Sequence, residues 1–137
     1  MSRKVSGYSV KSLRDKLGIK SGYSAVLINT PFSYLKDFGD LSDVEVYVTP
    51  KKDHDFIHLF VKEKEQLKEL LPSLQKALKS TGMIWVSWPK KSSKVQSDIS
   101  EDTIREICLP LGLVDIKVAA VDEIWSGLKL VIRTSLR

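Results

Sequence analysis

The chain has 137 residues, 42% hydrophobic and 28% charged, which fits one domain built around one core. Its one cysteine, Cys108, excludes an intramolecular disulfide and a cysteine-only zinc site and is typical of a reducing compartment. No apolar run reaches the roughly 18 residues of a membrane span, and the first residues lack the apolar stretch of a secretory signal. We therefore expect a soluble cytoplasmic protein with no membrane partner.

The formal net charge of +5 lies entirely in the first 24 residues, where six basic residues oppose one acid. Residues 25–137 hold 16 basic and 16 acidic residues and are neutral as a group. A basic segment before a neutral domain can bind nucleic acid, contact an anionic surface or form a solvated helix face. Because the segment has only Tyr8 and Tyr23 as aromatics, we favour the solvated face and keep nucleic-acid binding as an alternative.

The first elements are a short helix and a buried strand. Ser9 is placed to cap the helix and Gly18 to end it, and one helical face carries the apolar residues Val10, Leu13 and Leu17. The continuous apolar run 25–28 predicts a strand that is buried on both faces.

A second helix and two more strands follow. Thr30 as the cap and Pro31 as the first helical residue predict the start of this helix, and Gly39 predicts its end. We expect its inner face to carry Phe32, Leu35 and Phe38. Residues 44–48 alternate in character and predict an edge strand, and residues 56–61 predict a third strand.

Residues 62–80 predict a helix with a wide apolar stripe formed by Leu67, Leu70, Leu71, Leu74 and Leu78. Pro72 predicts a kink or a break into two helices, because proline removes a backbone donor and clashes with the preceding turn. Residues 83–88 predict a fourth, buried strand.

The last third of the chain predicts one helix and a hairpin. Asp98 and Glu101 have capping-box spacing for a helix that ends at Pro110 and Gly112 and carries Ile104, Ile107 and Cys108. Residues 114–121 and 128–133 predict two strands, and the gap between them is too short for a parallel crossover.

This order of elements predicts a three-layer, Rossmann-like α/β fold. We expect a mostly parallel sheet of about six strands that ends in an antiparallel hairpin. Residues 1–137 form a single domain in this interpretation, and residues 1–24 are a basic lead-in that contains a short helix.

Two resemblances support this interpretation. Residues 55–61, the leucine helix, "STGMIWVSWPK" and "LGLVDIKVAAVDEIWSGLKLVIR" resemble the Rossmann-like methyltransferases from the fourth strand to the last hairpin. The segments "GYSVKSLRDKLGIKSG", "GMIWVSWPKKS" and "WSGLKLVI" resemble a family of small bacterial proteins of unknown function that is well represented in actinobacteria. The first resemblance implies the fold, and the second implies a bacterial origin without implying an activity.

Ligands of open α/β sheets bind beyond the carboxyl ends of the strands. At these ends we expect a site for a small anionic ligand formed by Asn29, Thr30, Trp88, Lys90, Lys91 and Lys94, with a solvated lysine loop as the alternative. The turn after the first strand has no glycine, and Thr49 and Pro50 stand where an acid would hold a ribose. We therefore predict no cofactor.

Other chemistry finds little support in the sequence. His54 and His58 would lie about 13 Å apart on a strand, too far to share a metal ion, and we expect His58 at the edge of the core with a hydrogen-bond partner. Cys108 lies on an apolar helix face, and no serine has a nucleophile-elbow pattern. The sequence favours a binding or interaction module over an enzyme. The alternatives are a degenerate or active adenosylmethionine-dependent methyltransferase-like enzyme and nucleic-acid binding through the basic segment.

Overall fold

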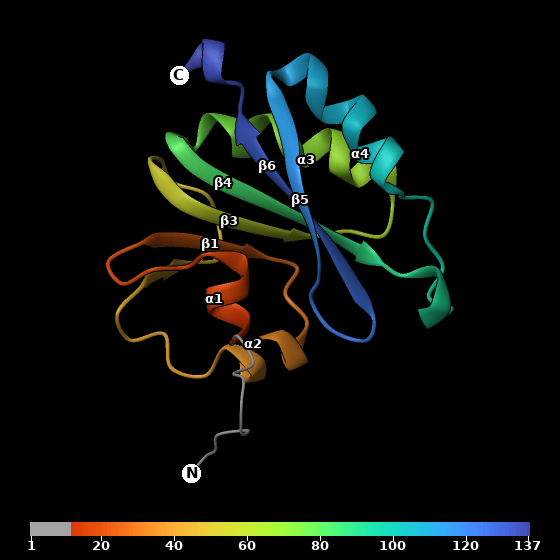
Figure 1. Cartoon of the computed structure of the whole chain (residues 1–137), viewed down its shortest axis with the longest axis horizontal. Helices are drawn as coiled ribbons and strands as arrows, with labels where there is room; N and C mark the ends of the chain where they lie inside the picture. Colours follow the sequence, from red (N-terminus) through yellow and green to blue (C-terminus); the bar gives the residue numbers. More distant parts are fainter. Residues whose placement is uncertain (1–11) are drawn as a thin grey trace, which may run out of the picture.

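The computed structural model describes residues 12–137, in which six strands form one sheet with the order β2-β1-β3-β4-β6-β5 (Figure 1). The strands are β1 (Ser24–Ile28), β2 (Glu45–Tyr47), β3 (His54–Phe60), β4 (Leu78–Pro89), β5 (Leu113–Ala120) and β6 (Trp125–Ile132). Neighbours among β2, β1, β3 and β4 are parallel, and β6 is antiparallel to both β4 and β5. The predicted mostly parallel sheet with a closing antiparallel hairpin is confirmed.

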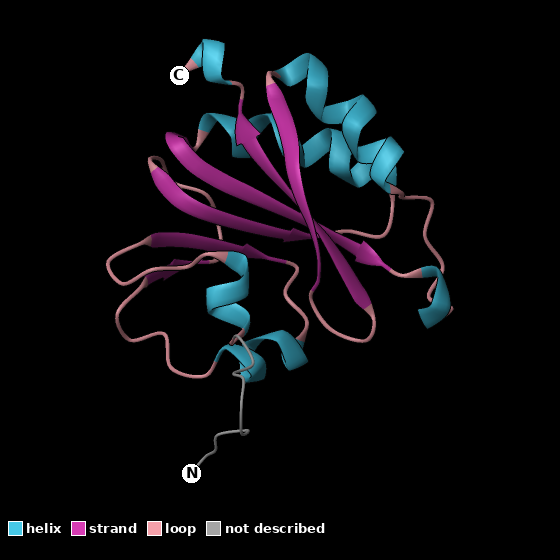
Figure 2. Cartoon of the chain, in the orientation of Figure 1, coloured by secondary structure: helices cyan, strands magenta, loops and turns pink. Residues whose placement is uncertain are grey.

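Helices cover both faces of this sheet (Figure 2). They are α1 (Leu13–Leu17), α2 (Phe32–Phe38), α3 (Lys64–Lys76) and α4 (Glu101–Cys108), with the single turns η1 (Lys91–Ser93), η2 (Leu109–Leu111) and η3 (Thr134–Leu136). One core lies between the sheet and the pair α3 and α4, and a second core lies between the sheet and the pair α1 and α2. None of the helices in residues 12–137 is long and apolar enough to cross a membrane.

The strands β1 and β2 have the burial that their sequence patterns predict. The centre of β1 is buried on both faces, because helices cover both sides of the sheet at this strand. β2 is short, largely exposed and at the edge of the sheet, as the alternating pattern predicts. Gly18 ends α1 in the left-handed conformation that glycine adopts without strain, whereas the expected cap Ser9 lies outside the described residues and Ser12 caps the helix instead.

The predicted inner face of α2 is correct for Phe38 but wrong for Phe32 and Leu35. Phe32 is 79% exposed and Leu35 is 45% exposed, whereas Tyr34 and Phe38 are buried against the sheet. Tyr34 and Phe38 are four residues apart and share one helix face, and the hydroxyl of Tyr34 finds a polar partner inside the core. Thr30 is not the cap either, because Pro31 occupies that position and provides no side-chain hydrogen bond.

Pro72 lies inside α3 and does not break this helix. α3 runs without interruption across it, because three turns of the helix are fixed by the buried residues Leu67, Leu71 and Leu74. Leu78, predicted to continue the stripe, instead begins β4, since α3 ends at Lys76.

The start of α4 and the connection between β5 and β6 also differ from the prediction. Ser100 caps α4 by accepting a hydrogen bond from the Thr103 N–H at 3.3 Å. Asp98 lies two residues before this cap and accepts from the Lys64 N–H of α3 at 2.8 Å, so that it caps a different helix. In the hairpin, β6 begins at Trp125, which makes the connection shorter than predicted.

Candidate functional site

A cleft of about 950 Å³ opens at the carboxyl ends of β1 and β3, beside the start of β6. This volume lies within the range of small-molecule sites. The residues that line it come from the turn after β1, the junction of β3 and α3, the loop before α4, and β6: Asn29, Pro31, Phe60, Lys62, Glu63, Gln66, Val95, Gln96, Ser97, Asp98 and Trp125.

The turn after β1 contributes the side-chain amide of Asn29 to the cleft. Asn29 has a φ of 58°, in the left-handed region that favours glycine and that asparagine tolerates better than most residues. Its Nδ2 donates to the Phe60 carbonyl oxygen at 3.2 Å, which joins the ends of β1 and β3. Pro31 follows and has no backbone N–H to offer a ligand.

The opposite wall is a loop that is bonded to the start of α3. The Ser97 hydroxyl donates to the Lys62 carbonyl oxygen at 2.7 Å, and the Asp98 carboxylate accepts from the Lys64 N–H. These residues lie more than 30 positions apart in the chain, so the two bonds hold residues 95–98 against the junction of β3 and α3.

Two aromatic rings form the inner end of the cleft. Phe60 and Trp125 pack edge to face with their ring centres 5.2 Å apart. Phe60 also stacks on His58, with the ring centres 4.2 Å apart and the planes within 17°. The inner end is therefore apolar and rests directly on the core between the sheet and α2.

Behind Phe60, a buried chain of polar side chains connects α2 to the sheet. The Tyr34 hydroxyl lies 2.6 Å from Nδ1 of His58, and Nε2 of His58 lies 2.7 Å from the Ser87 hydroxyl. All three side chains are fully buried, and burial lowers the pKa of His58 to about 3. Although a serine next to a histidine can act as a nucleophile, these groups cannot meet a substrate, and the arrangement is structural.

The residues predicted as an anion site lie in different environments. Asn29 lines the cleft, and Thr30 follows it in the same turn. Trp88 is 8% exposed and packs in the core on the side of α3 and α4. The lysines Lys90, Lys91 and Lys94 are at or near η1, and none of them is among the residues that line the cleft.

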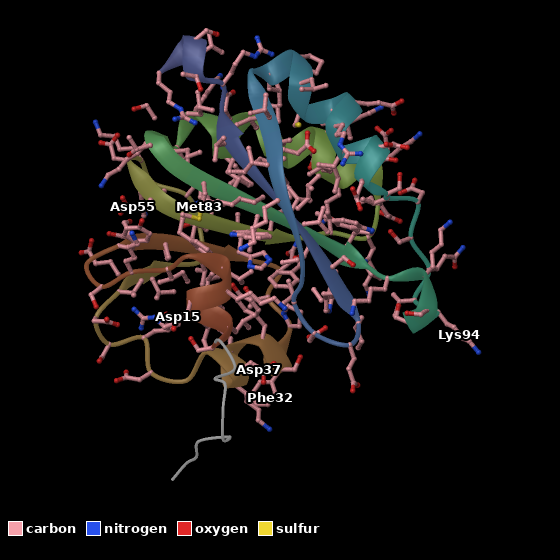
Figure 3. The ribbon with its side chains drawn as sticks, viewed as in Figure 1. Asp15, Phe32, Asp37, Asp55, Met83 and Lys94 are labelled. Carbon is pink, nitrogen blue, oxygen red and sulfur yellow. The ribbon has the colours of Figure 1, made fainter. Side chains whose placement is uncertain are left out.

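Two of the three loop lysines are exposed to solvent. Lys91 and Lys94 are exposed, and Figure 3 shows the Lys94 side chain directed away from the sheet at the outer end of this loop. Lys90 is half-buried, and its backbone N–H donates to the Ile124 carbonyl oxygen at 2.7 Å.

Sequence reasoning did not identify the polar residues Gln66, Gln96, Ser97 and Asp98 of the cleft. Lys62 directly follows the predicted strand 56–61, but it is not among the residues predicted for the site. The loop before α4 gave no comparable signal, since nothing in its sequence shows that it returns to the start of α3.

The other candidate groups have structural roles. His54 is buried, with Nδ1 2.8 Å from the Ser24 hydroxyl and Nε2 accepting from the Lys51 N–H at 2.8 Å. His58 is satisfied by hydrogen bonds, as predicted, but it lies inside the core rather than at its edge. Burial raises the pKa of Cys108 to about 11, so this thiol behaves as a small apolar group.

The charges of the cleft lining are mixed. One lysine, Lys62, lies among two carboxylates, Glu63 and Asp98, and neither Lys62 nor Glu63 forms an ion pair with another residue in 12–137. Three side-chain amides add both donors and acceptors. Such a lining suits an uncharged or zwitterionic polar molecule.

Solved structures with the same fold include methyltransferases. A SAM-dependent methyltransferase from Aquifex aeolicus is 18% identical, with a TM-score of 0.61 and 86% of each chain covered. A ribosomal protein L11 methylase from Lactobacillus delbrueckii subsp. bulgaricus is 14% identical, with a TM-score of 0.59 and 88% of this chain and 75% of that chain covered. The chain therefore has a methyltransferase-like α/β fold.

The structure of LepI in complex with SAM is also similar, with 14% identity and a TM-score of 0.57. The match covers 88% of this chain but 39% of the LepI chain, so this chain spans about two fifths of that protein. Neither the family models nor the curated protein sequences gave a match. The resemblance to the small bacterial family stays a prediction.

The residues present do not fit adenosylmethionine in the position in which this fold holds a nucleotide cofactor. The turn after β1 has Asn29 and Pro31 instead of the glycines that let a backbone approach such a ligand. Val48, Thr49 and Pro50 follow β2 and supply no carboxylate for a ribose. None of the residues that line the cleft comes from β2.

Proposed function

We propose that this chain is a degenerate methyltransferase-like domain that binds a small polar molecule of nucleoside size in the cleft at the carboxyl ends of β1 and β3. The observation that carries the proposal is the cleft itself, which has a suitable volume and lies at the edge of the sheet where α/β folds bind ligands. The mixed charges and the three amides favour a molecule with both hydrogen-bond donors and acceptors.

The amides and the aromatic rings suggest how such a molecule would lie. Gln66 and Gln96 offer a donor and an acceptor each, which suits the edge of a heterocycle or the hydroxyls of a sugar. Lys62 and Glu63, which form no ion pair with described residues, would neutralise the opposite charges of a zwitterion. The apolar end at Phe60 and Trp125 would exclude water from a flat ring.

The proposal is tested by thermal shift and calorimetry on the whole chain with adenosine, adenosylmethionine, S-adenosylhomocysteine, glutamine and inorganic phosphate. We expect at least one of adenosine, S-adenosylhomocysteine and glutamine to raise the melting temperature. Gln66→Ala and Lys62→Gln should each weaken its binding by about tenfold, the loss of roughly one good hydrogen bond.

Lys94→Gln is the matched control, because Lys94 is an exposed lysine outside the cleft. It should bind like the wild type. Tight binding of phosphate that depends on Lys94 and not on Lys62 would place the site in the lysine loop predicted from the sequence and would contradict our proposal. Absence of binding by every organic ligand would count against it as well.

An adenosylmethionine-dependent enzyme is the second candidate, because similar solved structures include one in complex with SAM. Micromolar binding of adenosylmethionine in the same calorimetric experiment would favour this candidate. The absence of glycine after β1 and of an acid after β2 leads us to expect no such binding.

A further inference from the structure

Two lysines face each other across the closing hairpin. Lys117 of β5 and Lys129 of β6 are direct register partners, which places their Cβ atoms about 4.5–5.5 Å apart. Like charges in this position destabilise a sheet. A negatively charged group between the two lysines would therefore stabilise the hairpin.

A β-bulge creates this pair. Asp115 is the partner of Leu130 and Lys117 is the partner of Lys129, so Ile116 is an extra residue between them. In a regular strand Asp115 and Lys117 would share one face. The bulge instead leaves Asp115 on the face of α4, bonded to Arg105 at 2.8 Å, and turns Lys117 to the opposite face.

No carboxylate in the described residues neutralises the two lysines. The ion pairs in residues 12–137 involve Arg14, Lys68, Lys79 and Arg105, and neither Lys117 nor Lys129 takes part in one. Lys129 is half-buried, and both this burial and the neighbouring Lys117 ammonium lower its pKa.

The pair lies on the face of the sheet that carries α1. Lys129 is the register partner of Trp85 on its other side, and the Trp85 indole N–H donates to the Leu17 carbonyl oxygen of α1 at 2.8 Å. Lys129 lies four residues along β6 from Trp125, about 13 Å from the cleft.

We propose that Lys117 and Lys129 form an anion site that binds a phosphate group, separate from the cleft at the strand ends. Lysine binds phosphate as a point charge, and two ammonium groups on adjacent strands match a group with two or more negative charges. The phosphate can belong to a small molecule or to a nucleic-acid strand.

The test compares wild type with Lys117→Gln and Lys129→Gln in a low-salt zwitterionic buffer. Without a multivalent anion, Lys117→Gln should melt at a higher temperature than wild type, because the like-charge contact is gone. Inorganic pyrophosphate should raise the melting temperature of wild type but not of either variant. Lys52→Gln changes an exposed lysine between β2 and β3, and it should respond to pyrophosphate as wild type does.

Fluorescence polarisation with a fluorescein-labelled 20-nucleotide oligothymidylate identifies the source of the phosphate. Binding that weakens at least tenfold in Lys117→Gln indicates a nucleic-acid strand, whereas a response to pyrophosphate alone indicates a small phosphate compound. The proposal is overturned if Lys117→Gln retains the full responses to pyrophosphate and to the oligonucleotide, or if wild type responds to neither.

Discussion

The Tyr34–His58–Ser87 chain shows how single residues attach α2 to the sheet. Each ring nitrogen of His58 has a hydroxyl partner, so the imidazole is buried without an unsatisfied polar group. The stack on Phe60 then supports the apolar end of the cleft. The hydrogen bonding of His58 could be predicted from the sequence. Its partner Tyr34 could not, because the aromatic residues of α2 also fit a different helix face.

This burial makes stability depend on pH. Unfolded His58 takes up a proton near pH 6.5, whereas burial lowers the pKa of the folded residue to about 3, so the unfolded state binds more protons between these values. The free energy of unfolding therefore falls as the pH falls, and the contribution of His58 should fall by about 2 kcal/mol between pH 7 and pH 5.

Urea unfolding of the whole chain at pH 7, 6 and 5 measures this dependence. His54 is present in both wild type and His58→Gln, so its contribution to the pH dependence is the same in both. The free energy of unfolding of His58→Gln should therefore change less with pH than that of wild type, by the amount that His58 contributes. If His58→Gln does not fold, the NMR titration of wild type is decisive. The His58 ring signals should remain those of a neutral imidazole at pH 5, and protonation near pH 6.5 would contradict the structure.

At the scale of elements, the strand patterns predicted their structures better than the helix patterns did. The β1 run and the edge strand β2 lie where their apolar residues indicate. The helices differ at their ends and faces, because Asp98 caps α3 from a distant loop and Pro72 is tolerated within packed turns. Contacts of this kind join segments that are distant in the sequence, and local sequence patterns cannot predict them.

Pro72 should cost α3 part of its stability. It lacks the N–H that would donate to the Lys68 carbonyl oxygen one turn earlier. Pro72→Ala should therefore raise the free energy of unfolding by about 1 kcal/mol or more, since alanine is favoured over proline inside a helix by about 3 kcal/mol and the more flexible unfolded chain offsets part of this gain.

Chemical denaturation measures the change, with Pro110→Ala as the matched control. Pro110 lies in the first turn of η2, where a proline is compatible with the backbone, so its replacement should bring no gain. An unchanged or lower stability of Pro72→Ala would mean that the proline contributes packing against α4 that outweighs the missing hydrogen bond.

At the scale of the whole molecule, the order of elements predicted the sheet and its closing hairpin, and the solved structures of similar fold agree. The sequence placed the candidate site at the carboxyl ends of the strands, where the cleft also lies, but of the predicted residues only Asn29 lines this cleft. Asn29 follows a strand and was predicted, and Lys62 follows a strand but was not, whereas residues 95–98 reach the cleft through bonds to the start of α3. The predicted lysine loop follows β4 at the same edge of the sheet, and its residues Lys91 and Lys94 are exposed.

The central claim is that ligands bind in the cleft between β1, β3 and β6, away from the end of β2. Nitrogen-15 NMR spectra of the whole chain, recorded during titration with adenosine, adenosylmethionine, S-adenosylhomocysteine and glutamine, test it most directly. We predict saturable shifts of the side-chain amide signals of Asn29, Gln66 and Gln96 and of the Trp125 indole signal with at least one of these ligands. Shifts confined to residues 45–50 or to the loop 90–94, or no shift with any of the four, would contradict the claim.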